Sequence, residues 1–339
     1  MSTLFSQLPK ISLGFFPTPL TELKRFAKNL NGPRIFIKRD DLSGLAFGGN
    51  KTRKLEFLIA DALKLGCDTI ITAGAAQSNH CRQTAAAAAA CGLECHLALG
   101  GRSPETLEGN LLLDDLLGAK IHWTGLLRKG ETIPDIVNEL TSLGKKPYVI
   151  PYGGSNEIGA TGFIEAIKEL QIQLDSLGFS ISHIIFPSSS GGTHSGMMIG
   201  NSMFAQNRFK LIGIGIDKEE AGDGPFDEHV IRLANSTCVK LNLDVKYTLN
   251  NVIIRNEYLG DGYGVVGDLE RRAIRLLAET EGILVDPVYT GRALGGMINM
   301  IEKKEFSSDD MVLFWHTGGN PALFPYSDDI TKHGKGGSL

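Results

Sequence analysis

Lys51 is the residue of this sequence whose position best suits it to act as a nucleophile. It lies in the run Gly48-Gly49-Asn50-Lys51-Thr52-Arg53-Lys54, and apolar residues recur at helical spacing just downstream. Asn50 is therefore expected to cap a helix, with Lys51 in its first turn. A helix start carries partial positive charge, which disfavours an ammonium and should push Lys51 towards its neutral, nucleophilic form. A single lysine is more often a solvated surface residue, so this hypothesis depends on the rest of the site.

A second motif, Ser188-Ser189-Ser190-Gly191-Gly192-Thr193, follows an expected strand and precedes an expected helix. Glycines let backbone N–H groups approach an anion, hydroxyls add donors, and a helix start favours negative charge. The loop contains no lysine, so it is not a nucleotide P-loop and suits a monophosphate better than a triphosphate. Without the other motifs, an ordinary Ser/Gly turn would be the better interpretation.

The segment Gln77-Ser78-Asn79-His80 also lies between an expected strand and an expected helix. Its side chains and free backbone donors could bind the carboxylate of an amino acid. Ser78 could equally cap the following helix, and both roles are compatible. We interpret His80 as a packed residue rather than the catalytic base.

Two tyrosines, Tyr263 and Tyr289, lie on turns bounded by glycines. A phenol in such a place can stack on an aromatic ring or donate a hydrogen bond near a reacting carbon. For either tyrosine alone, simple packing is the commoner role.

Strands and helices alternate along most of the chain, which predicts an α/β fold of parallel sheets covered by helices. The alanine run 85–90 is expected to be a helix packed closely on a sheet, because alanine adds no bulk and has the best helix propensity. Strands are expected over 69–72, 95–99, 121–123, 148–150, 183–186, 211–214 and 311–315, and further helices over 108–117 and from 163 to 174.

Composition sets the broad class. The 339 residues are more than one core usually organises, so two domains are expected. With 42% hydrophobic residues, no long apolar run and no secretory signal, the chain is expected to be a soluble cytoplasmic protein. The net charge of −4 argues against nucleic acid or a membrane as partner. Five cysteines without a CxxC pair and scattered histidines predict no disulfide framework and no metal site.

The motifs together carry a family resemblance. GGNKTRKLEFL, AAQSNH, SSSGGTHSG, GDGYGVV, DPVYTGRALGG and FWHTGGNPALF occur in the order and spacing of the pyridoxal-phosphate enzymes that include 1-aminocyclopropane-1-carboxylate (ACC) deaminase and D-cysteine desulfhydrase. The resemblance runs from about Pro17 to Pro325. It implies the two-domain fold type II of these enzymes, similar to the tryptophan synthase β-subunit, with pyridoxal 5'-phosphate as cofactor and a homodimer as assembly. It also places a smaller domain at 52–162 inside a larger one at 1–51 and 163–339.

The resemblance also implies roles for single residues. Lys51 would hold the cofactor as a Schiff base, and Thr317 would be the neutral partner of the pyridine nitrogen. Asn79 would contact the ring hydroxyl, and Ser78 the substrate carboxylate or a proton in transfer. Tyr289 would lie against the cofactor and Tyr263 near the substrate. The residues expected to hold the phosphate are Ser189, Ser190, Gly191, Gly192 and Thr193, and those expected to bind substrate are Gln77, Ser78, Asn79 and Tyr263.

Position 290 separates the relatives from one another. ACC deaminases resemble DPVYEG there, whereas this chain has Thr290, as D-cysteine desulfhydrases do. Without a carboxylate at the pyridine nitrogen the ring is a weaker electron sink, which disfavours cyclopropane opening and favours α,β-elimination. We therefore expect a carbon–sulfur lyase that converts D-cysteine to pyruvate, hydrogen sulfide and ammonia. The alternatives are an L-cysteate sulfo-lyase, then an ACC deaminase, and a pyridoxal-phosphate-binding protein without turnover. A dinucleotide site is not supported, because Gly213-Ile214-Gly215 does not continue as G-x-G-x-x-G.

Overall fold

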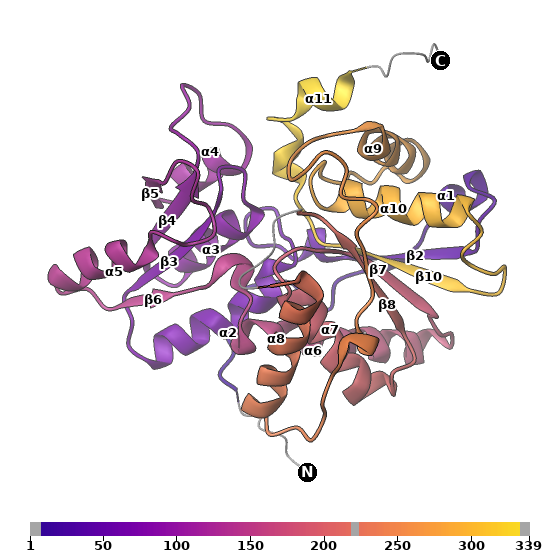
Figure 1. Cartoon of the computed structure of the whole chain (residues 1–339), viewed down its shortest axis with the longest axis horizontal. Helices are drawn as coiled ribbons and strands as arrows, with labels where there is room; N and C mark the ends of the chain where they lie inside the picture. Colours follow the sequence, from indigo (N-terminus) through magenta and orange to yellow (C-terminus); the bar gives the residue numbers. More distant parts are fainter. Residues whose placement is uncertain (1–7, 218–223, 333–339) are drawn as a thin grey trace.

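The computed structural model describes residues 8–217 and 224–332, and their strands form two separate sheets that lie side by side in Figure 1. The larger sheet has the strand order β1-β2-β10-β7-β8-β9. Its strands are β1 (Leu20–Glu22), β2 (Arg34–Arg39), β10 (Met311–His316), β7 (His183–Ser188), β8 (Lys210–Gly215) and β9 (Ile254–Arg255). All pairs are parallel except that of β1 with β2, where the edge strand β1 runs antiparallel.

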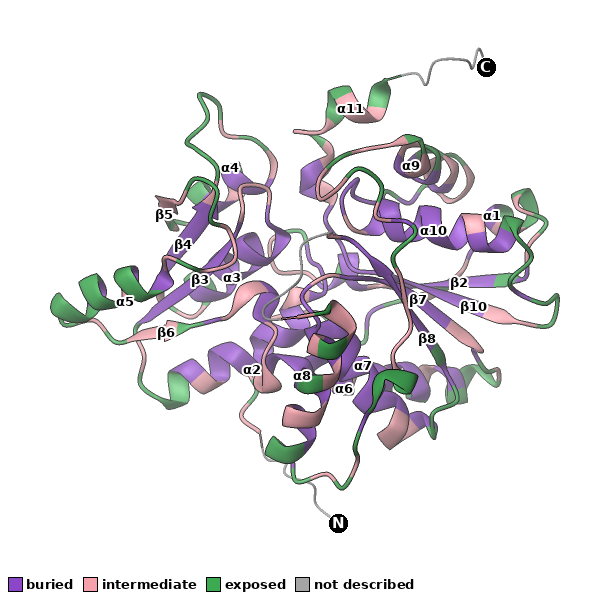
Figure 2. Ribbon diagram, in the orientation of Figure 1, coloured by how far each residue is buried: buried purple, intermediate pink, exposed green. Residues whose placement is uncertain are grey.

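Helices cover both faces of the larger sheet, as Figure 1 shows. One face carries α6 (Glu157–Leu177), α7 (Gly192–Ala205) and α8 (Phe226–Lys240), and the other carries α1 (Lys24–Asn29), α9 (Asp268–Glu281) and α10 (Thr290–Glu302). Each face has its own apolar core, and the inner strands are coloured as buried along most of their length in Figure 2. Burial on both faces explains why these strands read as continuous apolar runs in the sequence.

The smaller sheet is parallel throughout and has the order β5-β4-β3-β6. Its strands are β3 (Thr69–Ala75), β4 (Glu94–Gly100), β5 (Lys120–Trp123) and β6 (Pro147–Val149). The helices α2 (Lys51–Lys64), α3 (Asn79–Ala90) and α4 (Gly109–Leu116) share one core, and α5 (Ile133–Ser142) contributes to the other. The alanine run is confirmed as part of α3, where Ala85, Ala87 and Ala88 are completely buried.

The predicted fold class is confirmed: two α/β units with parallel sheets covered by helices. The two units meet where α2 packs on α6. The domain division at 52 and 162 stays a prediction, and α6 itself begins at Glu157, a few residues before that boundary. The chain closes with the short helix α11 (Ser327–Thr331).

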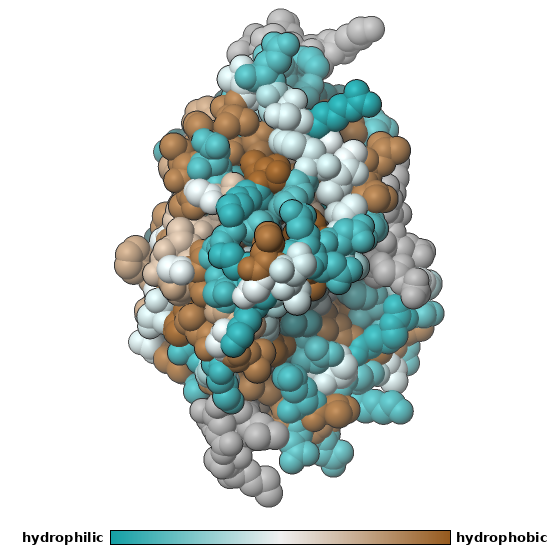
Figure 3. All heavy atoms as spheres, turned by 90° about the vertical axis from the view of Figure 1, so that its left-hand side faces the viewer, coloured by the Kyte–Doolittle hydropathy of each residue, from teal (hydrophilic) through white to brown (hydrophobic). Residues whose placement is uncertain are grey.

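None of the described helices is long and apolar enough to cross a membrane. Figure 3 shows the side of the molecule formed by the smaller sheet and its helices, where hydrophilic side chains occupy much of the centre and hydrophobic ones gather mainly towards one edge.

Candidate active site

A cavity of about 580 Å³, part of it open to solvent, lies between the two units. Segments that follow the carboxyl ends of β3, β7 and β10 supply much of its wall, as expected for parallel α/β sheets. Its lining residues are Asn50, Lys51, Ser78, Asn79, His80, Tyr152, Gly153, Pro187, Ser189, Ser190, Gly191, Thr193, Tyr289 and Thr317.

Lys51 is the first residue of α2, as predicted. Its Nζ donates to the carbonyl oxygen of Gly153 at 3.2 Å. Burial lowers the pKa of Lys51 to about 8, so a much larger fraction of the amine is neutral near neutral pH than for an exposed lysine. The predicted direction of the pKa shift is confirmed, but its main cause is desolvation and not the partial positive charge at the helix start. Asn50 occupies the N-cap position without a capping side-chain bond, and its Nδ2 donates to Thr193 Oγ1 at 3.2 Å.

A second lysine, Lys54, lies one helical turn after Lys51 and is completely buried. Its Nζ donates to the same Gly153 oxygen at 3.0 Å and to Ser155 Oγ at 3.2 Å. Burial, together with the neighbouring Lys51, lowers the pKa of Lys54 well below its ordinary value. Two partly desolvated amines therefore share one carbonyl, an arrangement that suits a site built to receive an anion.

The serine–glycine loop joins β7 to α7. Ser155 Oγ contacts Ser190 Oγ at 2.8 Å and accepts from the backbone N–H of Gly192 at 3.1 Å. A Cβ added to Gly192 would lie 2.7 Å from Ser155 Oγ and 2.9 Å from Lys54 Nζ, so the loop passes directly over the buried amine of Lys54. Gly191 has φ +84°, which an L side chain adopts only with strain.

Ser78 and Asn79 lie where β3 passes into α3, and both line the cavity. Ser78 caps α3 as expected, with its Oγ accepting from Cys81 N at 3.2 Å, which leaves its hydroxyl hydrogen free to donate elsewhere. Asn110 Nδ2 donates to Asn79 Oδ1 at 2.9 Å and thereby orients the Asn79 amide. Gln77 is not among the lining residues, and its amide joins Glu108 O and Asn110 N at the start of α4.

His80 lines the cavity in its neutral form, because burial, with Lys51 and Lys54 close by, lowers its pKa well below the ordinary value. Thr72 Oγ1 donates its hydrogen to Ile150 O at 2.8 Å, so His80 Nε2, 2.8 Å from the same hydroxyl, must be the protonated ring nitrogen. This partner favours the interpretation of His80 as a packed residue.

Three tyrosines lie in the cavity wall or directly next to it. Tyr289 and Tyr152 line the cavity, and Tyr263 reaches it through a 2.6 Å hydrogen bond between its hydroxyl and that of Tyr289. Burial raises the pKa of Tyr152 to about 12 and the pKa values of Tyr263 and Tyr289 well above their ordinary range, so all three phenols stay protonated. Arg128 lies 4.6 Å from the centre of the Tyr263 ring and is ion-paired with Asp217 at 2.8 Å.

Thr317 and Thr290 differ in where they point. Thr317 lines the cavity, and its carbonyl accepts from Asn50 N at 3.0 Å. The hydroxyl of Thr290 instead donates to Asp286 Oδ1 at 2.6 Å and accepts from Asp286 N at 2.8 Å. Thr317 is therefore the threonine of the two whose side chain belongs to the cavity wall.

Three contributors to this site were not predicted from the sequence. Tyr152 and the Gly153 carbonyl come from a segment that no motif marks as functional, and Lys54 lies within the Lys51 motif but was given no role there. The glycines at 153 and 154 were a usable signal, since both have positive φ and form the turn that brings the carbonyl to the two lysines.

Two parallel α/β units, with a half-buried lysine and a serine–glycine loop in the cavity between them, are typical of enzymes that bind a phosphorylated aldehyde through an amine. The chain belongs to the pyridoxal-phosphate dependent enzyme family, whose model matches residues 11–318.

Several proteins of known function or structure are similar to this chain over nearly its full length. The chain is 42% identical over 327 residues to a D-cysteine desulfhydrase of Klebsiella pneumoniae subsp. pneumoniae, covering 95% of this chain and 97% of that protein. A D-cysteine desulfhydrase of a second Klebsiella pneumoniae strain is 41% identical over the same shares. Among solved structures, an ACC deaminase homologue superposes with a TM-score of 0.88 at 34% identity, covering 96% of this chain and 97% of that one. An O-ureido-L-serine synthase mutant with bound O-ureido-L-serine shares the fold, with a TM-score of 0.64 at 16% identity over 99% of this chain and 96% of that one.

The residues present fit pyridoxal phosphate. The cavity presents an amine of low pKa and a loop whose glycines would clash with added side chains. Hydroxyls, the start of α7 and the buried Lys54 meet at this loop, a donor set suited to a phosphate.

Proposed function

We propose that this protein is a D-cysteine desulfhydrase, a carbon–sulfur lyase that converts D-cysteine and water to pyruvate, hydrogen sulfide and ammonia. The observation that carries the proposal is its identity of 42% with a D-cysteine desulfhydrase over 95% of the chain. The side chains of the cavity support it, because they bring together an amine that can act as a base, hydrogen-bond donors for the substrate carboxylate, and neutral phenols.

Pyridoxal phosphate, when bound, withdraws electrons from the substrate Cα, so that the α-proton becomes acidic and the β-thiolate can leave. Lys51 Nζ is the amine that would hold the cofactor. The same nitrogen would take the α-proton of the substrate, and a pKa of about 8 suits a base that works near neutral pH. Ser78 Oγ is the alternative group for this proton transfer.

The phosphate end is assigned to Ser189, Ser190, Gly191, Gly192 and Thr193. Their hydroxyls and backbone N–H groups would bind the anion, and the buried amine of Lys54 beneath them is a further hydrogen-bond donor. At the ring, Asn79 Nδ2 is the donor for the hydroxyl, because Asn110 already engages Oδ1. Thr317 faces the pyridine nitrogen with a neutral hydroxyl, which keeps the ring a moderate electron sink.

Substrate recognition is assigned to Ser78 and the start of α3, which offer a hydroxyl and helix N–H groups to the α-carboxylate. Tyr289 would lie against the ring, and Tyr263 would lie near the substrate and hold the Tyr289 hydroxyl through their hydrogen bond. Gln77 acts through Asn110, since its amide positions the residue that orients Asn79.

The cavity wall disfavours the L-cysteate alternative. A sulfonate needs a cation near the β-carbon, and no arginine is among the described residues that line the cavity; Arg128, which lies 4.6 Å from the centre of the Tyr263 ring, is ion-paired with Asp217. Arg82 is buried and donates to Gly48 O at 2.7 Å, and Arg102 lies on an exposed loop. ACC deamination is disfavoured by Thr290, whose hydroxyl is committed to Asp286.

A product assay with D-cysteine, L-cysteine, L-cysteate and ACC side by side tests the proposal. Sulfide and pyruvate from D-cysteine in preference to the other three are expected. Sulfite from L-cysteate, or 2-oxobutyrate from ACC, as the fastest product would replace the proposal by the corresponding alternative. No product from any of them would favour a binding protein.

We further infer a cytoplasmic homodimer, as the family resemblance implies. Exposed apolar side chains of Phe15, Leu42, Phe47 and Leu284 line one surface cavity and provide a face that a second copy could cover.

A further inference from the structure

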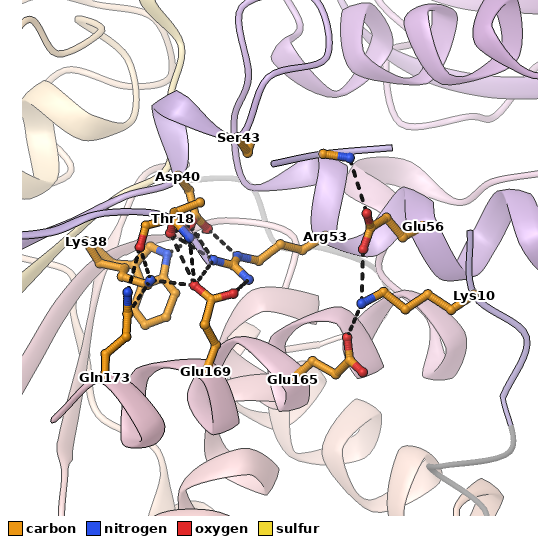
Figure 4. A network of polar contacts seen from close by, with 12 residues as sticks. Lys10, Thr18, Lys38, Asp40, Ser43, Arg53, Glu56, Glu165, Glu169 and Gln173 are labelled. Atoms are coloured by element: carbon orange, nitrogen blue, oxygen red, sulfur yellow. Dashed lines mark hydrogen bonds and ion pairs between the residues drawn. The ribbon is translucent and has the colours of Figure 1, made fainter. Parts of the chain in front are cut away.

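A buried network of charged residues includes Arg53, which comes from the first turn of α2, the helix that begins with Lys51 (Figure 4). Its core is two cations and two carboxylates: Lys38, Asp40, Arg53 and Glu169. Lys38 and Asp40 are completely buried, and Arg53 is 4% exposed. The charges balance, and each has a partner of opposite sign, as groups removed from water require.

Arg53 anchors the first turn of α2 to this network. It follows Lys51 by two residues, which places the two side chains about 200° apart around the helix axis, on opposite sides. Its Nε and Nη2 donate to the two Asp40 oxygens at 2.9 and 2.8 Å, and Nη1 and Nη2 donate to Glu169 at 2.9 Å each. Burial opposes the charge on Arg53, but Asp40 and Glu169 raise its pKa, so it stays a fixed cation. A bidentate guanidinium–carboxylate pair fixes direction as well as distance.

Asp40 has contacts that Glu169 lacks. Asp40 Oδ2 also accepts from Trp315 Nε1 at 2.8 Å, near the end of β10 and two residues before Thr317. Its backbone oxygen accepts from Gly49 N at 2.9 Å, in the loop that leads to Lys51. A single residue thus touches the helix that carries the reactive amine, the loop before it and the strand that delivers Thr317.

We propose that Asp40 is a positioning residue that fixes Lys51 relative to Thr317, and hence the two ends of the cofactor ring relative to each other. Asp40 does not line the cavity and acts through Arg53, Trp315 and Gly49. The proposal rests on the cofactor assignment, and only its kinetic readout rests on the proposed reaction.

Asp40→Asn tests the proposal, with Glu169→Gln as the matched control. Both changes remove one buried carboxylate charge from Arg53, but only Asp40→Asn also disturbs the contact with Trp315. We expect both variants to lose thermal stability. Asp40→Asn should in addition weaken equilibrium binding of pyridoxal phosphate to the apoenzyme about tenfold or more, and shift the visible absorbance of the holoenzyme. It should lower kcat for D-cysteine with little change in KM.

Trp315→Phe is the second variant, for the case that Asp40→Asn does not fold. It keeps most of the ring and removes the N–H that Asp40 accepts, so a smaller change in the same absorbance and affinity is expected. Equal cofactor affinity and absorbance in Asp40→Asn and Glu169→Gln would overturn the proposal and leave Asp40 a purely structural residue. Wild-type behaviour of Trp315→Phe in both readouts would overturn it as well. Because these two readouts use no substrate, they stand whether or not D-cysteine proves to be the substrate.

Discussion

At the scale of single residues, burial makes Lys51 reactive. The ammonium form is disfavoured by the loss of water around it, and one backbone carbonyl, shared with Lys54, is its hydrogen-bond acceptor. The helix start that the sequence reveals therefore fixes where the amine points, whereas desolvation sets most of its pKa.

Replacement of Lys51 by alanine should abolish both turnover and the visible absorbance of the holoenzyme, because no other side chain is assigned to attach the cofactor. The matched control is Lys64→Ala, which removes an exposed lysine from the other end of the same helix and should change neither. Absorbance spectra and a sulfide assay check both variants. Normal activity in the Lys51→Ala variant would remove the basis of the proposed function.

The capture of pyridoxal phosphate by the apoenzyme should depend on pH in a way set by Lys51. Only the neutral amine attacks the aldehyde, so the rate should rise with pH and level off above about 8, whereas an ordinary lysine would continue to gain up to 10.5. Rapid mixing of apoenzyme and cofactor over a series of pH values measures this. A rate that still climbs steeply above about pH 9 would contradict the lowered pKa.

At the scale of elements, close contacts with neighbouring elements constrain the loop between β7 and α7. Gly191 needs its positive φ, and an added Cβ would lie 2.8 Å from the ring of His229. Gly178 at the end of α6 has a similar φ of +72° but open space around it.

A comparison of alanine variants at these two glycines distinguishes the effect of backbone strain on stability from the effect of a displaced loop on cofactor affinity. Alanine at Gly178, which has left-handed backbone angles, costs roughly 1–2 kcal/mol, and alanine at Gly191, whose ψ is −38°, costs at least as much. Gly191→Ala should also weaken pyridoxal phosphate binding about tenfold or more, because the loop must shift, whereas Gly178→Ala should leave cofactor affinity unchanged. Thermal unfolding and cofactor titration of both variants make the comparison. Equal affinities would mean that the loop does not hold the phosphate.

At the scale of the whole molecule, two surfaces bear on function. One is the interface between the two units, and the other is a solvent-exposed face beside the loop that precedes Lys51. The first contains the cavity, which takes its walls from both units. The second contains Phe15 and Phe47, which are 77% and 66% exposed. They line one surface cavity together with Leu42 and Leu284, and apolar side chains gathered in one place mark interaction sites more often than those scattered singly.

The homodimer proposal predicts a molar mass in solution of twice 36.6 kDa. Phe47→Glu should shift the protein towards the monomer, because a charge would be buried at the interface without a partner. Leu126→Glu is the control, since Leu126 is 99% exposed but belongs to the smaller unit, away from the proposed face. Light scattering after size-exclusion chromatography measures both. A dimer that resists Phe47→Glu would place the interface elsewhere.

Much of this protein follows from its sequence alone. The alternation of buried strands and amphipathic helices is local, set by side-chain periods of two and 3.6, so the α/β class and most elements could be predicted. Lys51 and the loop at 188–193 were found because each motif combines a helix start with residue types that suit one chemistry. The hydroxyl at Thr317 and the absence of a carboxylate at Thr290 could also be read directly.

The tertiary structure decided what surrounds these residues. The Gly153 carbonyl, Tyr152 and Asn110 reach the site from segments far along the chain, and no local pattern records such contacts. The same holds for Asp40, which accepts hydrogen bonds from Arg53 and from Trp315 on strands and helices that only packing brings together. Position in the sequence can mark a reactive group, but its pKa and orientation depend on burial and on distant partners, which exist only once the two units have folded against each other.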